Sequence, residues 1–156
     1  MPADEQALAQ AFDQLFPMLV QNLLQHFKSE TYKAGLTLPQ FYLLRQLRMY
    51  GPWTAAQVGE ALGITSGPVS GLTKRMISQG LLARRVDDTD RRVAWFSVTA
   101  KGDGLVAEAS RHLVRRWRRV IEEFGAQRAE ELLGQLTAIA QILRELQPGD
   151  AGRPGA

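Results

Sequence analysis

The chain has 156 residues, a length typical of one domain with a core that buries roughly two-thirds of its unfolded surface. Apolar residues make up 45% of it and charged residues 22%, as in ordinary soluble globular proteins. It contains no cysteine, which excludes disulfides, thiolate metal sites and thiol-based redox sensing. Its acidic start lacks the pattern of a signal peptide, and no apolar run approaches the ~18 residues of a membrane span. We therefore expect a cytoplasmic protein with no membrane partner.

The positive charge is concentrated in the middle of the chain. Residues 64–121 contain twelve Lys or Arg and five Asp or Glu, a net charge of +7, whereas residues 1–30 and 122–156 each carry −3. A basic surface between acidic ends suits a polyanion, and nucleic acid is the commonest one. A surface of internal salt bridges is the alternative.

The first element expected is a long helix. Apolar residues recur at spacings of three and four from Leu8 to Phe27, which places them on one helical face. Pro17 falls inside this stripe and predicts a kink or an irregular turn, because proline has no backbone N–H to donate. Gly35 breaks the pattern and ends the helix.

Two capping boxes then mark the starts of two shorter helices. Thr37 with Gln40 opens a helix that ends at Gly51, and Thr54 with Gln57 opens one that Gly63 stops. A third helix is expected to begin after Thr65 or Ser66 and to end at Gly80. The tight turn between the last two helices gives the outline of a helix-turn-helix.

A β-hairpin is expected next, because the apolar period changes. Residues 82–86 and 93–98 are short β-prone runs around a polar, turn-rich loop. Thr99 caps another long helix, which Gly125 interrupts, and a last helix extends to Leu146. The remaining residues, 148–156, are rich in Gly and Pro and are expected to be disordered.

Three patches in this order resemble the MarR family of winged helix-turn-helix transcriptional regulators. The first is Leu-Pro-Gln-Phe at 38–41, and the second runs from Val69 to Arg84. The most specific is Asp-Asp-Thr-Asp-Arg-Arg at 87–92, followed at the family's spacing by Val-Thr-Ala-Lys-Gly at 98–102. The resemblance covers residues 5 to 147.

The resemblance implies a mainly α fold with a small β-hairpin wing, built as a winged helix-turn-helix plus a helical dimerisation region. Residues 1–35 would supply an N-terminal dimerisation helix, 36–99 the DNA-binding domain and 100–147 the C-terminal dimerisation helices. It also implies a homodimer that binds a pseudo-palindromic operator on double-stranded DNA. We expect a repressor that leaves its operator when a small-molecule ligand binds.

The third helix is the candidate recognition helix. Small polar residues near its N-terminus would let it lie deep in a groove, where its amides and hydroxyls meet phosphates. Family members often carry a longer polar side chain at the position of Gly71, so more of the specificity would fall on the wing and on DNA shape. The candidate DNA contacts of this helix are Ser66, Gly67, Pro68, Ser70, Gly71, Lys74 and Arg75.

The loop of the hairpin matches the family pattern Asp-x-Arg at Asp90 and Arg92. The resemblance implies that Arg92 enters the minor groove while Asp90 holds it. A narrow A·T-rich minor groove concentrates negative potential, and a guanidinium is weakly hydrated enough to enter it. Arg91 beside it and Arg84 at the wing's base complete the candidate contacts.

Other residue groups give weaker indications. His26 and His112 are too few for a metal site and are expected at an interface, so no metal or cofactor is predicted. The basic run at 111–119 either extends the DNA footprint or, as we favour, forms helix-surface pairs such as Arg118 with Glu122. Six aromatic residues are expected either to line a pocket for a small aromatic ligand or to be plain core: Phe12, Phe16, Tyr32, Phe41, Trp53 and Trp95.

Two other functional classes are the alternatives to a DNA-binding regulator. No constellation of residues supports an enzyme. A winged-helix protein-interaction module whose DNA surface has decayed is the stronger alternative, and Gly67 and Gly71 are the residues that favour it.

Overall fold

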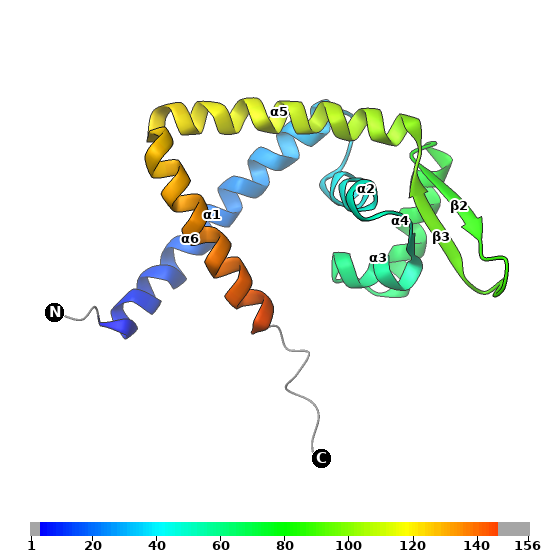
Figure 1. The fold of residues 1–156 in the computed structure, drawn as a ribbon, viewed down its shortest axis with the longest axis horizontal. Helices are drawn as coiled ribbons and strands as arrows, with labels where there is room; N and C mark the ends of the chain where they lie inside the picture. Colours follow the sequence, from blue (N-terminus) through cyan, green and yellow to red (C-terminus); the bar gives the residue numbers. More distant parts are fainter. Residues whose placement is uncertain (1–3, 147–156) are drawn as a thin grey trace, which may run out of the picture. The chain divides into compact units, whose positions relative to one another are not determined.

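The computed structural model describes residues 4–146, so the predicted disordered tail lies outside the described residues. The chain divides into two compact units, Met1–Leu113 and Val114–Ala156, each described by itself below. As predicted, the fold is mostly helical with a small antiparallel sheet (Figure 1). In chain order the elements are α1 (Glu5–Lys33), α2 (Leu38–Tyr50), β1 (Trp53–Thr54), α3 (Ala55–Leu62), α4 (Ser66–Ser78), β2 (Leu82–Val86), β3 (Ala94–Val98), α5 (Ala100–Phe124) and α6 (Ala126–Glu145).

Helix α1 runs without interruption through Pro17, so the irregular turn that the sequence suggested is absent. Asp4 caps its start by accepting from the backbone amide of Gln6 (3.1 Å). Most of its apolar stripe is exposed within this chain, with Phe12 stacked at a tilt on Phe16. None of the helices described between residues 4 and 146 is long and apolar enough to cross a membrane.

Both predicted capping boxes are confirmed. At the start of α2, the Thr37 amide donates to Gln40 Oε1 (2.9 Å) and the Gln40 amide donates to Thr37 Oγ1 (3.5 Å). Thr54 and Gln57 make the same reciprocal pair at the start of α3. These bonds satisfy amides that have no partner inside the helix, and they fix where each helix begins.

The turn between α3 and α4 is made by Gly63, whose backbone is left-handed (φ 63°). A residue with a Cβ would be strained there, because L side chains disfavour this region. The turn allows the amide of Ile64 to donate back to the carbonyl of Gly59 (3.0 Å). Helices α3 and α4 therefore form the predicted helix-turn-helix.

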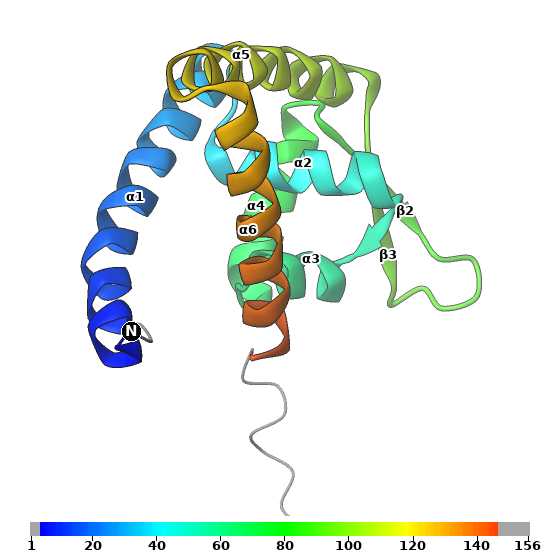
Figure 2. The same cartoon turned by 60° about the vertical axis from the view of Figure 1, so that its left-hand side comes forward.

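The sheet has three strands in the order β1-β3-β2, one more than the sequence predicted. Strands β2 and β3 form the expected hairpin, with Leu82 opposite Val98 and Val86 opposite Ala94. The additional strand, β1, pairs Trp53 with Phe96. Figures 1 and 2 show the tip of the hairpin extending away from the helices of the same unit.

One apolar core holds the winged region together. It joins one face of α2 to buried residues of α3, α4, the sheet and the first half of α5. The hairpin and helix α4 are therefore both attached to the same core. Its largest fully buried apolar side chains are Leu36, Leu43, Leu44, Val58, Val69, Met76 and Val106.

The second unit consists of the end of α5 and helix α6. None of the residues of α6 is buried within the chain. Many of its apolar side chains are exposed, among them Leu133 and Leu146. The predicted surface pair is present, since Arg118 Nε donates to Glu122 Oε1 at 3.1 Å.

Candidate nucleic-acid interface

Helix α4 presents a polar face to solvent and an apolar face to the core. Val69, Thr73 and Met76 are buried, and the Thr73 hydroxyl donates to the carbonyl of Val69 (2.9 Å). All seven residues predicted to meet DNA on this helix are exposed, from Ser66 to Arg75. Pro68 lies in the first turn, where a missing N–H does no harm.

The exposed face is flat where the two glycines lie. A Cβ added to Gly67 or to Gly71 would have no heavy atom within 4 Å. The packing of this chain therefore does not require glycine at either position. Gly67 lies in the first turn of α4, where the absence of a side chain leaves open space beside the backbone. Thr65, the N-cap residue, makes no side-chain bond to the backbone amides of this turn.

Gln79, just after α4, joins the helix to its neighbours. Gln40 Nε2 of α2 donates to Gln79 Oε1 (2.8 Å), and Lys101 Nζ of α5 donates to the Gln79 carbonyl (2.8 Å). Gln40 is itself buried. These bonds fix the C-terminal end of α4 against α2 and the start of α5.

The wing loop, residues 87–93, is ordered by the carboxylate of Asp87. One oxygen accepts from the Thr89 amide (2.9 Å), the Thr89 hydroxyl (2.6 Å) and the Asp90 amide (3.0 Å). The other accepts from Trp95 Nε1 (2.9 Å). The pKa of Asp87 lies well below its usual range, because each of these hydrogen bonds stabilises the charged carboxylate. The Thr89 hydroxyl contributes most, followed by the indole and then by the two backbone amides.

The side chain of Asp90 contacts the backbone of Arg92. Asp90 Oδ1 accepts from the backbone amide of Arg92 (2.9 Å), and the Asp90 carbonyl accepts from the amide of Val93 (2.9 Å). The sequence suggested that Asp90 would orient the guanidinium. The bond in the structure instead fixes the backbone from which the guanidinium extends.

The other basic residues of the wing are exposed as well. Arg91 lies beside Arg92 at the tip, and Arg84 lies in β2. Arg85 makes an exposed pair with Asp88 (3.5 Å). The wing thus brings four arginines to the surface of one hairpin.

The six aromatic residues predicted for a ligand pocket do not come together. Of the six, only Phe41 lines a pocket beside α2, and Tyr32, 81% exposed, lines a second, smaller pocket. Trp53 stacks on Tyr50 (6.5 Å between ring centroids), and Trp95 belongs to the wing. Phe12 and Phe16 pair on α1.

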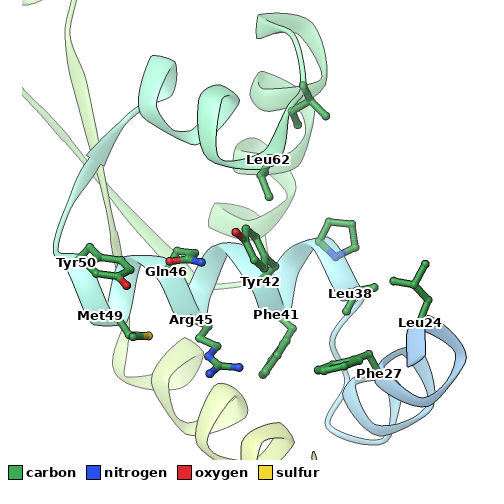
Figure 3. A pocket seen from close by; sticks show the side chains of 12 residues that line it. Leu24, Phe27, Leu38, Phe41, Tyr42, Arg45, Gln46, Met49, Tyr50 and Leu62 are labelled. Atoms are coloured by element: carbon green, nitrogen blue, oxygen red, sulfur yellow. The ribbon is translucent and has the colours of Figure 1, made fainter. Parts of the chain in front are cut away.

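The larger pocket has a volume of about 730 Å³ and lies between α1, α2 and the turn before α4 (Figure 3). Its lining is mainly apolar, with a few polar groups from α2. The sequence carries a signal for this surface, since Leu38, Tyr42, Arg45 and Met49 recur every three or four residues on a helix face outside the core stripe. The lining residues are Leu24, Phe27, Leu38, Pro39, Phe41, Tyr42, Arg45, Gln46, Met49, Tyr50, Leu62 and Ile64.

The side chain of His112 lies close to two carboxylates. His112 Nδ1 lies 3.6 Å from Glu30 Oε2, and His112 Nε2 lies 3.9 Å from Glu108 Oε1, which ties α1 to α5. Within residues 4–146 no group of three or more His, Asp or Glu is arranged to hold a metal ion.

Comparison with known proteins bears on this geometry. The model of the MarR family matches residues 34–93, from the end of α1 to the wing loop. The transcriptional regulator MhqR of Bacillus subtilis is 29% identical over 86 residues, which are 55% of this chain and 59% of that protein. The match thus spans less than two-thirds of the relative's length.

Solved structures share the fold over more of the chain. A MarR family transcription regulator superposes with a TM-score of 0.78 at 20% identity, covering 94% of this chain and 96% of that one. The repressor CouR, solved bound to a 23-mer DNA duplex, superposes with a TM-score of 0.74 at 23% identity, covering 85% of this chain and 94% of that one.

Proposed function

We propose that this chain is a transcriptional regulator of the MarR family, a cytoplasmic repressor that binds a pseudo-palindromic operator as a homodimer. The observation that carries the proposal is the wing loop. Its tip exposes Arg91 and Arg92 on a backbone fixed by the carboxylates of Asp87 and Asp90. The exposed polar face of α4 lies on the same rigid unit.

Helix α4 enters the major groove in this proposal. The groove is about 12 Å wide and admits a helix, and glycine at 67 and 71 lets the helix backbone approach closely. The unbonded amides of the first turn and the hydroxyls of Ser66 and Ser70 then meet phosphates. Because this face has few long side chains, it reads few base edges, and Arg92 in the minor groove supplies much of the specificity.

Lys74→Gln tests the placement of α4. We expect the slope of log K against log salt to become less steep by about one for each protomer, since one phosphate contact per protomer is lost. Lys28→Gln is the matched control, because it removes the same charge from exposed α1 and leaves the slope unchanged. Equal slopes for the wild type and Lys74→Gln would place α4 away from the phosphates.

Two exposed apolar surfaces support the homodimer. One is the stripe on α1, and the other covers α6, which buries no residue within the chain. Contiguous apolar surface on a soluble protein marks an interface, and a second copy of the same helices covers it in this proposal.

We also propose that the pocket beside α2 takes a small aromatic ligand. It replaces the six-residue pocket suggested by the sequence, of which it keeps only Phe41. Its apolar lining suits an aromatic ring, and Arg45 suits an acidic group on that ring (Figure 3). Because Ile64 of the turn before α4 lines the same pocket, an occupant can shift α4 and weaken DNA binding.

Benzoate and benzylamine serve as the probes for this pocket. We expect millimolar benzoate, but not benzylamine, to raise the melting temperature and to lower DNA affinity at least threefold, and Arg45→Ala to abolish both effects. Arg48→Ala is the matched control on the same helix, since Arg48 pairs with Asp103 (2.9 Å) and does not line the pocket. A benzoate response that survives in Arg45→Ala would contradict the assignment of Arg45.

A further inference from the structure

Trp95 lies on the central strand of the sheet and contacts the loop of the wing. It pairs with Arg85 of β2 on one side and Thr54 of β1 on the other. From this position its indole Nε1 donates to Asp87 Oδ2 at 2.9 Å. Asp87 is the first residue after β2, so this bond crosses the base of the loop and joins two residues that are eight positions apart in sequence.

The same carboxylate also reaches forward into the loop. Its other oxygen accepts hydrogen bonds from the backbone amides of Thr89 and Asp90 and from the Thr89 hydroxyl. Asp90 in turn receives the amide of Arg92 (2.9 Å). A continuous series of hydrogen bonds therefore runs from the indole ring, through two carboxylates, to the backbone of Arg92.

We propose that the Trp95–Asp87 hydrogen bond, here called the wing latch, holds the loop in the shape that presents Arg92 to DNA. Trp95 and Asp87 are then positioning residues for the contact on which the proposed function rests. Neither needs to touch DNA itself. The latch acts by limiting the number of loop conformations before binding, so that less conformational entropy is lost when DNA binds.

The negative charge of Asp87 gives a further reason to regard it as a positioning residue. A carboxylate beside a DNA-binding tip repels phosphates, so an acidic residue there weakens binding unless it does something else. Asp87 receives four hydrogen bonds, which also lower its pKa and keep it charged. Its neighbour Asp88 makes an ion pair with Arg85 at 3.5 Å, and its side chain is almost fully exposed.

The two aspartates therefore form a matched pair for experiment. Asp87→Ala and Asp88→Ala remove the same charge one residue apart. We expect Asp88→Ala to leave DNA affinity unchanged or raise it slightly, and Asp87→Ala to lower it by about tenfold, because the loop loses its organising acceptor. Because both substitutions remove one negative charge, a difference between their effects on DNA affinity reports the positioning role of Asp87 and not its charge.

Trp95→Phe keeps the ring and removes only the N–H donor. We expect it to lower DNA affinity about fivefold in the wild-type background and not at all in Asp87→Ala, where the acceptor is already missing. Trp117→Phe in α5 is the control for loss of a tryptophan. The midpoint of urea unfolding should change little in Trp95→Phe, because the loop is exposed and the core is untouched.

A measurement without DNA completes the test. In NMR spectra of the free protein, we expect the amides of Thr89, Asp90 and Arg92 to exchange at least threefold faster in Trp95→Phe than in the wild type. Unchanged amide exchange would overturn the latch. So would a loss of DNA affinity on Trp95→Phe that is as large in the Asp87→Ala background as in the wild type. If Arg92→Ala binds DNA as tightly as the wild type, the proposed function fails instead. Faster exchange in Trp95→Phe with unchanged DNA affinity would overturn the positioning role alone.

Discussion

Arg92→Ala is expected to lower affinity for the operator by about 10- to 100-fold, the largest effect of any single surface substitution in this protein. A 10- to 100-fold loss corresponds to about 1.4–2.8 kcal/mol, or roughly 0.7–1.4 kcal/mol for the guanidinium removed from the minor groove at each half-site of the proposed dimer. The operator is obtained by selecting bound genomic fragments, and affinity is then measured by titration at fixed salt. Fragments whose half-sites repeat about one helical turn apart would fit two winged domains.

The control for Arg92→Ala is Arg118→Ala, which removes the same charge from a residue paired with Glu122. Sedimentation should give the same mass for both variants and the wild type. Replacing A·T pairs by G·C under the wing should cost the wild type affinity and cost Arg92→Ala little, because the variant no longer senses groove width. Equal sensitivity in both proteins would remove Arg92 from the minor groove. Complete absence of DNA binding at low salt, with a protein partner recovered instead, would favour the interaction module.

Features encoded within a few consecutive residues were predicted well. Each capping box needs only four residues, and the structure contains both with their reciprocal bonds. The hairpin was also predicted, because a polar loop between two β-prone runs is a local pattern. Of the kink or irregular turn expected at Pro17, the irregular turn is absent, since α1 continues through this residue as a helix. A helix can lose one backbone bond and continue when its flanking turns stay helical.

Features that depend on distant pairing were missed. Strand β1 has only two residues, and it exists because Trp53 pairs with Phe96 far along the chain. No alternation of apolar and polar residues can mark so short a strand. The bond from Trp95 to Asp87 also depends on the register of β2 and β3, which places the indole at the base of the loop. Composition alone grouped Trp95 with aromatic residues that lie elsewhere.

The pocket was misplaced for a related reason. Aromatic side chains are as useful for stacking on a surface or capping a core as for lining a cavity, and Trp53 on Tyr50 is an example of stacking. A cavity arises where helices diverge, and that depends on how α1 and α2 pack beside the turn before α4. The spacing of Tyr42 and Met49 marks a second face of α2, and only the three-dimensional arrangement shows that this face borders a cavity.

Gly102→Ala is expected to be the most destabilising methyl addition in the winged region. A Cβ at residue 102 would lie 2.5 Å from the Leu81 carbonyl oxygen, 3.0 Å from Val98 Cγ2 and 3.2 Å from Leu44 Cδ2. The Leu81 oxygen cannot easily move, because it accepts from the amide of Thr99 (3.1 Å). The start of α5 would have to shift away from the sheet, at a cost of about 2–3 kcal/mol.

Gly104→Ala, two residues further along α5, is the matched control. A Cβ there has no heavy atom within 4 Å, so alanine should stabilise the helix by about 0.5–1 kcal/mol. Urea unfolding at a fixed protein concentration compares the two variants, since a dimer's stability depends on concentration. Opposite signs are expected from the same chemical change in one helix. If Gly102→Ala were as stable as Gly104→Ala, the first turn of α5 would not pack closely on β2 and β3. The glycine that ends the Val-Thr-Ala-Lys-Gly motif would then lack its steric reason, which is to let the wing and the long helix meet without a side chain between them.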